Sequence, residues 1–185
     1  SGLKMTQTSV FDGHNDLLLA LWRSDDLNGN SFISGRDKGH IDLTRCKTGK
    51  LDGGFFAMFV PAATVAPDSF WRRHPELITD DMKKDTQTRS DNLLNTAPIS
   101  QAYAYAATIE MMDIAHQLAK QHPDKVQICT NSNEIKSSIG ADKIAILLHI
   151  EGAEAISADL HELEVLHNKG LRSIGPVWSR KNIFA

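Results

Sequence analysis

The amino-acid sequence predicts an α/β protein in which helices connect the strands of a parallel β-sheet. Two apolar runs, residues 53–60 and 144–150, have the length and the continuous hydrophobic character of buried strands. Between them, residues 99–121 repeat apolar side chains at spacings of three and four, which predicts a long helix. Repeated strand–helix units of this kind favour a parallel sheet, either open or closed into a barrel.

Shorter strands and helices complete the predicted pattern. Helices are expected to begin at Leu17 and at Asn131 or Ser132. Asp159 is placed to cap a further helix that Gly170 ends. Five strands are expected in total, at residues 9–12, 53–60, 126–129, 144–150 and 171–177.

The length of the chain limits the architecture. A closed (β/α)8 barrel typically needs about 250 residues, and this chain has 185 and stops in a predicted loop after the fifth strand. We therefore expect residues 1–185 to form one domain that is the N-terminal part of such a barrel. Residues 62–97 show no regular apolar period and are expected to be a loop insertion: a solvated loop, a lid over a site or an oligomer contact.

Composition excludes several classes of function. With 41% apolar and 23% charged residues, the chain is expected to fold. Its net charge of −3 argues against a nucleic-acid partner, and no apolar run reaches the roughly 18 residues of a membrane span. The two cysteines lie far apart, which favours a reducing compartment. We expect a cytoplasmic protein, with a processed periplasmic form as the alternative.

The motif DGHND, residues 12–16, lies at the end of the first predicted strand. Side chains two residues apart in an extended chain point to the same side, so His14 and Asp16 are expected to face a common point. The carboxyl ends of strands are where α/β barrels place their chemistry, and an imidazole with a carboxylate suits Zn²⁺. The alternative is that Asn15 or Asp16 only caps the helix beginning at Leu17.

Glu151 and Gly152 end the apolar run at residues 144–150. A carboxylate that ends such a run is costly to bury without a partner of opposite charge. A metal ion would be such a partner. A solvent-facing residue at a strand end is the alternative. His149 lies on the same side of the strand as Glu151 and one layer deeper, where we expect a core residue or one that supports a ligand.

Taken together, these motifs resemble the membrane dipeptidase family, the renal dipeptidase-like zinc metallopeptidases. The resemblance rests on FDGHND at residues 11–16, GHIDL at 39–43 and GGFF at 53–56. It continues with HIEGA at residues 149–153 and GLRSIGPVW at 170–178. Their order holds over nearly the whole chain, apart from the segment 62–97.

The resemblance implies a (β/α)8 barrel with a binuclear zinc centre that hydrolyses dipeptides, often with a D-residue on the carboxyl side, through a metal-activated hydroxide. His14 and Asp16 match the ligands of one zinc ion, and Glu151 matches the carboxylate that bridges both ions. Asp12 matches an acidic position of the family that would contact the zinc ligands and not the zinc ions. A dipeptide is the implied substrate.

Two departures from the family pattern leave alternatives open. The further zinc-binding histidines of the family belong to later strands, which this chain lacks, so it holds only part of the site. Trp178 stands where many members have a histidine that contacts the developing oxyanion, and we expect it to line the pocket. The alternatives are another amidohydrolase-type hydrolysis, such as deamination or lactone opening, and a non-catalytic half-barrel. Such a half-barrel would associate, for example as a homo-oligomer, through its exposed sheet edges.

Overall fold

One five-stranded parallel sheet forms the centre of the protein. The computed structural model describes residues 8–79 and 96–185. Its strands are β1 (Val10–Asn15), β2 (Leu51–Phe59), β3 (Val126–Ile128), β4 (Ile144–Glu151) and β5 (Leu171–Gly175). Every pairing between them is parallel, which confirms the predicted fold class. β1 runs on through His14 to Asn15, further than the sequence predicted.

Strand β4 organises the sheet because three other strands pair with it. β2 follows one of its edges over seven residue pairs, ending at Phe59 opposite Glu151. The other edge carries β3 at the start of β4 and β5 at its end, where Gly175 lies opposite Glu151. The carboxyl ends of β2, β4 and β5 therefore meet around Glu151.

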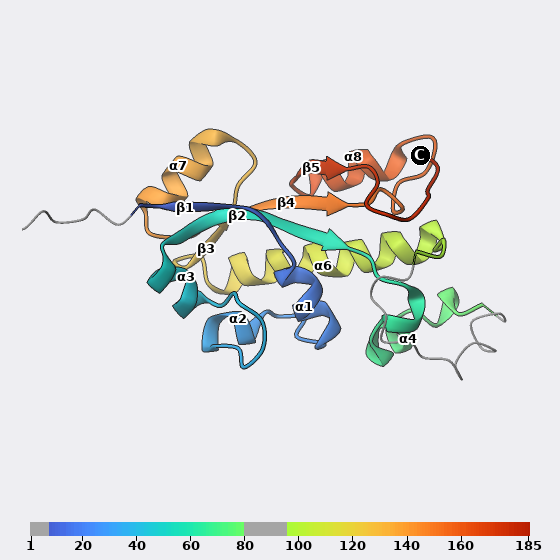
Figure 1. Cartoon of the computed structure of the whole chain (residues 1–185), viewed down its shortest axis with the longest axis horizontal. Coiled ribbons are helices and arrows are strands. Elements are labelled where there is room, and N and C mark those ends of the chain that lie inside the picture. The colour runs from blue at the N-terminus through green and yellow to red at the C-terminus, as the bar shows by residue number, and fades with distance from the viewer. Residues whose placement is uncertain (1–7, 80–95) are drawn as a thin grey trace, which may run out of the picture.

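Helices connect the strands, and α6 runs along one face of the sheet with α1 beside it (Figure 1). The predicted helix starts at Leu17 and at Ser132 are confirmed, and the Asn131 side chain caps the second of them. The predicted cap at Asp159 is wrong by one residue, because Leu160 occupies the cap position in a left-handed conformation. The Asp159 carboxylate still accepts the backbone N–H of His161. The helices are α1 (Leu17–Arg23), α2 (Asn30–Ser34), α3 (Leu43–Gly49), α4 (Asp68–Arg73), α6 (Gln101–Gln121), α7 (Ser132–Gly140) and α8 (His161–Asn168).

The two faces of β4 differ in burial. Alternate residues, including Ile146, Leu148 and Ile150, are buried in the hydrophobic core. The residues between them, which include His149 and Glu151, point to the opposite face and are only partly buried. Polar side chains of β4 thus lie on the face opposite its buried core residues. Within residues 8–79 and 96–185, no helix is both long and apolar enough to cross a membrane.

The expected insertion at residues 62–97 contains regular structure in its described part. Two 3₁₀ turns, Ala63–Val65 and Pro75–Leu77, flank α4. Phe70 of α4 is fully buried, and its ring packs edge-on against the rings of Trp22 and Tyr103 at 5.4 and 5.5 Å. α4 therefore contributes to the hydrophobic core through Phe70. Residues 80–95 lie outside the described part of the chain, and the role of the whole segment as an insertion stays a prediction.

Candidate metal centre

His14, Asp16 and Glu151 come together at the carboxyl edge of the sheet. His14 belongs to β1, Asp16 follows that strand directly, and Glu151 is the last residue of β4. The Nε2 atom of His14 lies 3.4 Å from Asp16 Oδ1 and 3.4 Å from Glu151 Oε2. One potential ligand atom from each residue falls within 4.8 Å of the others. The three side chains thus converge from two strands that are far apart in the sequence.

These separations fit the dimensions of a zinc site. Two ligand atoms bound at about 2.1 Å to a tetrahedral zinc ion lie about 3.4 Å apart. The distances from His14 Nε2 to both carboxylates have this value. One imidazole and two carboxylates are also a donor set that suits a divalent cation. The residues present therefore fit a metal ion in both spacing and chemistry.

An irregularity in β1 produces the convergence. The register of β1 against β2 shifts between Asp12 and Asn15, and Asp16 lies beyond the strand. Asp12 stabilises this bend, because its carboxylate accepts the backbone N–H of His14 and the Nδ2–H of Asn15, both at 3.2 Å. The expected closeness of His14 and Asp16 is observed, but the simple alternation of an extended strand is not its cause.

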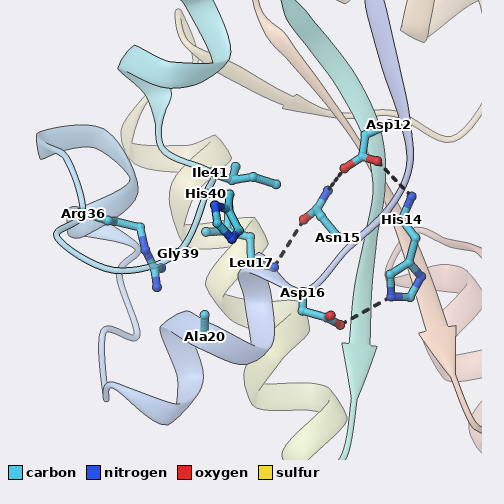
Figure 2. A pocket seen from close by; sticks show the side chains of 10 residues that line it. All are labelled: Asp12, His14, Asn15, Asp16, Leu17, Ala20, Arg36, Gly39, His40 and Ile41. Atoms are coloured by element: carbon cyan, nitrogen blue, oxygen red, sulfur yellow. Dashed lines mark hydrogen bonds and ion pairs between the residues drawn. The ribbon is translucent and has the colours of Figure 1, made fainter. Parts of the chain in front are cut away.

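The capping alternative fails for Asp16. Asp16 occupies the cap position of α1 by its backbone, yet its side chain makes no capping hydrogen bond. The buried Asn15 instead accepts the backbone N–H of Leu17 through its Oδ1 atom, at 3.3 Å. As Figure 2 shows, the Asp16 carboxylate is turned toward the His14 ring. It is therefore free to act as a ligand.

The electrostatics around Glu151 favour a cation. Burial raises the pKa of the Glu151 carboxyl group, the nearby His14 lowers that pKa, and the like charge of Asp16 raises it. Together these effects raise the pKa of Glu151. The groups around Glu151 therefore do not fully offset the cost of burying its negative charge. A cation held between the two carboxylates would supply that compensation.

His149 lies beside the site, as its position on β4 predicted. Its Nδ1 atom is 2.9 Å from the Ser173 hydroxyl oxygen, and its ring meets the His14 ring edge-on at 5.8 Å between centroids. Burial and the neighbouring His14 lower the pKa of His149. The ring thus forms part of the wall behind His14 while Ser173 fixes its orientation.

Trp178 lies at a different place from the cavity next to His14. Its ring packs edge-on against Phe59 at 5.1 Å and is 43% exposed. It does not line the cavity of about 410 Å³ beside His14 (Figure 2). That cavity is bounded by Asp12, His14, Asn15, Asp16, Leu17, Ala20, Arg36, Gly39, His40 and Ile41. The pocket-lining role of Trp178 therefore stays a prediction.

Some neighbours of the site were missed by the sequence reasoning. Arg36 and His40 form the far wall of the cavity, opposite β1 and α1 (Figure 2). Arg180 and Glu154 pair behind the end of β4. His40 is part of the GHIDL motif at residues 39–43, but no role at the site was assigned to it. No local pattern marks Arg36, Arg180 or Glu154, because each meets the site only through the tertiary fold. Arginine is rarely buried without a partner, so the burial of Arg180 in the structure is the observation that draws attention to it.

Relatives of known structure share this arrangement of strands. A dipeptidase AC, a metallo peptidase of family M19, is 32% identical and superimposes with a TM-score of 0.73 over 94% of this chain and 44% of its own. A Rhodobacter sphaeroides metallo peptidase, solved with a phosphinate mimic of the dipeptide L-Ala-D-Ala, is 31% identical with a TM-score of 0.73. It is matched over 95% of this chain and 47% of its own. These matches agree with a sheet that is part of a (β/α)8 barrel.

Sequence comparison gives the same assignment. An uncharacterized protein in the PQQ-III 3' region of Acinetobacter calcoaceticus is 37% identical over 98% of this chain and 52% of the relative. The chain thus spans about half the length of the relatives it matches. The sequence model for membrane dipeptidase (peptidase family M19) matches residues 4–185. With nearly its whole length matched, this chain belongs to the membrane dipeptidase family, peptidase family M19.

Proposed function

We propose that this chain carries part of the zinc centre of a dipeptidase, with His14, Asp16 and Glu151 as zinc ligands. The observation that carries the proposal is the pair of 3.4 Å distances from His14 Nε2 to the two carboxylates. Family membership supports the reaction class. The relative solved with a dipeptide mimic supports a dipeptide as the substrate.

Each residue has a defined task in this proposal. His14 offers Nε2 as a neutral nitrogen ligand, while Asp16 and Glu151 supply the negative charge that a divalent cation needs. Glu151, at the end of the central strand β4, would bridge two ions. When bound, zinc supplies a Lewis acid that polarises the peptide carbonyl and activates water for attack. Asp12 holds the His14 main chain in place.

The site in this chain has few ligands for two ions. A catalytic zinc ion usually has three protein ligands of its own. Among the residues that the structure describes, only His14, Asp16 and Glu151 converge at this site. We therefore expect the 185-residue chain alone to bind zinc weakly and to hydrolyse dipeptides slowly. The full activity is proposed for a protein in which the remaining ligands are also present.

Zinc binding is the first test. We expect titration of the metal-free chain to show zinc binding that Glu151→Gln weakens, because the amide has lost the ligand charge. Glu164→Gln is the matched control, since Glu164 is an exposed carboxylate of α8. Absence of zinc binding by the unsubstituted chain, or equal binding by both variants, would contradict the metal centre and favour the non-catalytic half-barrel.

The substrate class is tested with Gly-D-Ala and a phosphinate dipeptide mimic. With excess zinc, we expect turnover of Gly-D-Ala below about 1 per second, the low end of ordinary enzyme rates. The mimic should bind the zinc-loaded chain more tightly than it binds Glu151→Gln. Equal binding to both would contradict the dipeptide substrate. Turnover within the ordinary range of about 1–1000 per second would contradict a partial site.

A further inference from the structure

A buried arginine connects the segments that follow three neighbouring strands. Arg180 lies after β5, and its side chain is only 3% exposed. Its Nη1 atom donates to the carbonyl oxygen of Val60, directly after β2, at 3.1 Å. The same atom donates to Glu154 Oε1, in the segment after β4, at 3.4 Å. The guanidinium carbon also lies 5.8 Å from the centre of the Phe59 ring.

The segment after β4 is attached on its other side to β5. The backbone N–H of Gly152 donates to the carbonyl of Gly175 at 2.8 Å, and that of Ala153 donates to Pro176 at 2.9 Å. Gly152 has a φ of +91°, so the chain turns sharply immediately after Glu151. Arg180 contacts this turn through the Glu154 carboxylate.

Glu151 lies within this framework. It is opposite Phe59 of β2 on one edge of β4 and opposite Gly175 of β5 on the other. Arg180 contacts the Phe59 ring and the residue after it. The arginine therefore ties the main chain after β2 to the Glu154 side chain, three residues beyond Glu151.

Stability alone does not account for this arginine. Burying an ion pair costs desolvation that offsets much of its attraction, so a buried pair is by itself weak evidence for a stabilising role, although removal of one partner alone is destabilising. Groups that position metal ligands have another effect: those hydrogen-bonded to the ligands affect metal affinity about 10- to 100-fold, and a group that acts through the neighbouring chain is expected to have a smaller effect. We propose that Arg180 is a positioning residue that directs the Glu151 carboxylate toward His14, an inference that rests on the proposed metal centre.

The test measures metal affinity separately from folding. We compare the Kd for zinc in the unsubstituted chain and in Arg180→Met, which keeps an apolar stem but has no donor. We expect zinc to bind Arg180→Met up to about 10-fold more weakly, the lower end of the range for groups that contact the ligands directly. The absorption bands of bound Co²⁺ should also change, because the position of Glu151 in the coordination shell changes. Arg180→Lys keeps one cationic donor and should recover part of the affinity.

Arg73→Met is the matched control. Arg73 of α4 also donates hydrogen bonds to carboxylates, those of Glu110 in α6 and Asp25 after α1, and none of the three residues belongs to the sheet. We expect Arg73→Met to lower the stability of the metal-free chain and to leave zinc affinity and the Co²⁺ spectrum unchanged. An equal loss of affinity in both arginine variants would overturn the proposal, since it would reflect general loosening.

Two further results separate this proposal from the metal centre itself. If the unsubstituted chain binds zinc through Glu151 and Arg180→Met binds it equally, positioning by Arg180 is wrong and the metal centre stands. If the unsubstituted chain binds no zinc, the metal centre is wrong and this proposal is wrong with it. Should Arg180→Met not fold, Arg180→Lys and Glu154→Gln give the same comparison, and unchanged affinity in both would overturn the proposal.

Discussion

Gly53 of β2 lies between Phe11 of β1 and Ala145 of β4. A Cβ atom at this position would lie 2.7 Å from the carbonyl oxygen of Ala145 and 2.9 Å from a ring carbon of Phe11. Real Cβ atoms are essentially never found at such distances, so a side chain at Gly53 would force the β4 backbone at Ala145 and the Phe11 ring to shift. The absence of a side chain at Gly53 therefore allows β2 to lie between β1 and β4.

We predict that Gly53→Ala destabilises the chain by about 1–3 kcal/mol, the range typical of overpacked cores. Gly13→Ala is the control, because no heavy atom outside its chain neighbours lies within 4 Å of the Cβ position there. Its stability should be unchanged or slightly higher. Urea denaturation measures both, and equal losses would show that the close approach at Gly53 does not determine the effect.

At the level of single residues, sequence reasoning reached the candidate ligands but not their surroundings. His14, Asp16 and Glu151 could be selected because they end predicted strands, and parallel strands bring such ends to one edge. The pairing of Arg180 with Glu154 depends on how two turns fold back over β4, which no local pattern encodes. The bend in β1 was also missed, because it results from hydrogen bonds of Asp12.

At the level of elements, Glu110 of α6 holds three helices together. Its carboxylate accepts hydrogen bonds from Trp22 of α1 at 2.7 Å and from Arg73 of α4 at 2.8 and 2.9 Å. His74, which ends α4, lies 2.8 Å from it. Burial raises the pKa of Glu110, but these partners outweigh it and hold that pKa below its usual value.

The lowered pKa of Glu110 predicts a pH-dependent contribution to stability. A carboxyl group with a depressed pKa in the folded state stabilises it above its ordinary pKa of 4.5 and loses that contribution as pH falls through the folded value. We expect Glu110→Gln to reduce the free energy of unfolding by about 2 kcal/mol at pH 7. The difference from the unsubstituted chain should shrink below pH 4.5. A difference that is constant from pH 7 to pH 3 would contradict this.

Long elements were predicted better than short ones. α6 and the strands β2 and β4 have many residues in a regular period, so their existence was clear from the sequence. α2 and α4 have five and six residues, too few to show a period. For α3, a signal existed and was missed: Asp42 caps the helix by accepting the backbone N–H of Arg45 at 2.8 Å.

At the level of the whole molecule, β1 is an edge strand of the sheet as far as the described residues go. Within the described chain β1 pairs only with β2, and Val10 and Phe11 at its start are 45% and 39% exposed. Unpaired backbone groups beside exposed apolar side chains favour pairing with another strand. The strands were predictable, but their order was not, because β3 and β5 share one edge of β4.

We predict that the 185-residue chain associates with itself through this edge as its concentration rises. Val10→Lys should reduce the association, since a charge at an edge strand opposes pairing. Ile183→Lys is the control: this residue is 63% exposed, lies after β5 and should leave association unchanged. Sedimentation velocity over a range of concentrations measures all three proteins. A chain that stays monomeric throughout would contradict the prediction.

The central position of β4 has a consequence for the time at which the site is made. During synthesis, β1 and β2 leave the ribosome first, and α6 and β3 must follow before β4 emerges. Until then Glu151, the third proposed zinc ligand, is absent from beside His14 and Asp16, and the carboxyl end of β2 has no β4 beside it. A nascent chain could therefore bind zinc through all three side chains only after it has been translated through Glu151 and after β4 has joined the sheet.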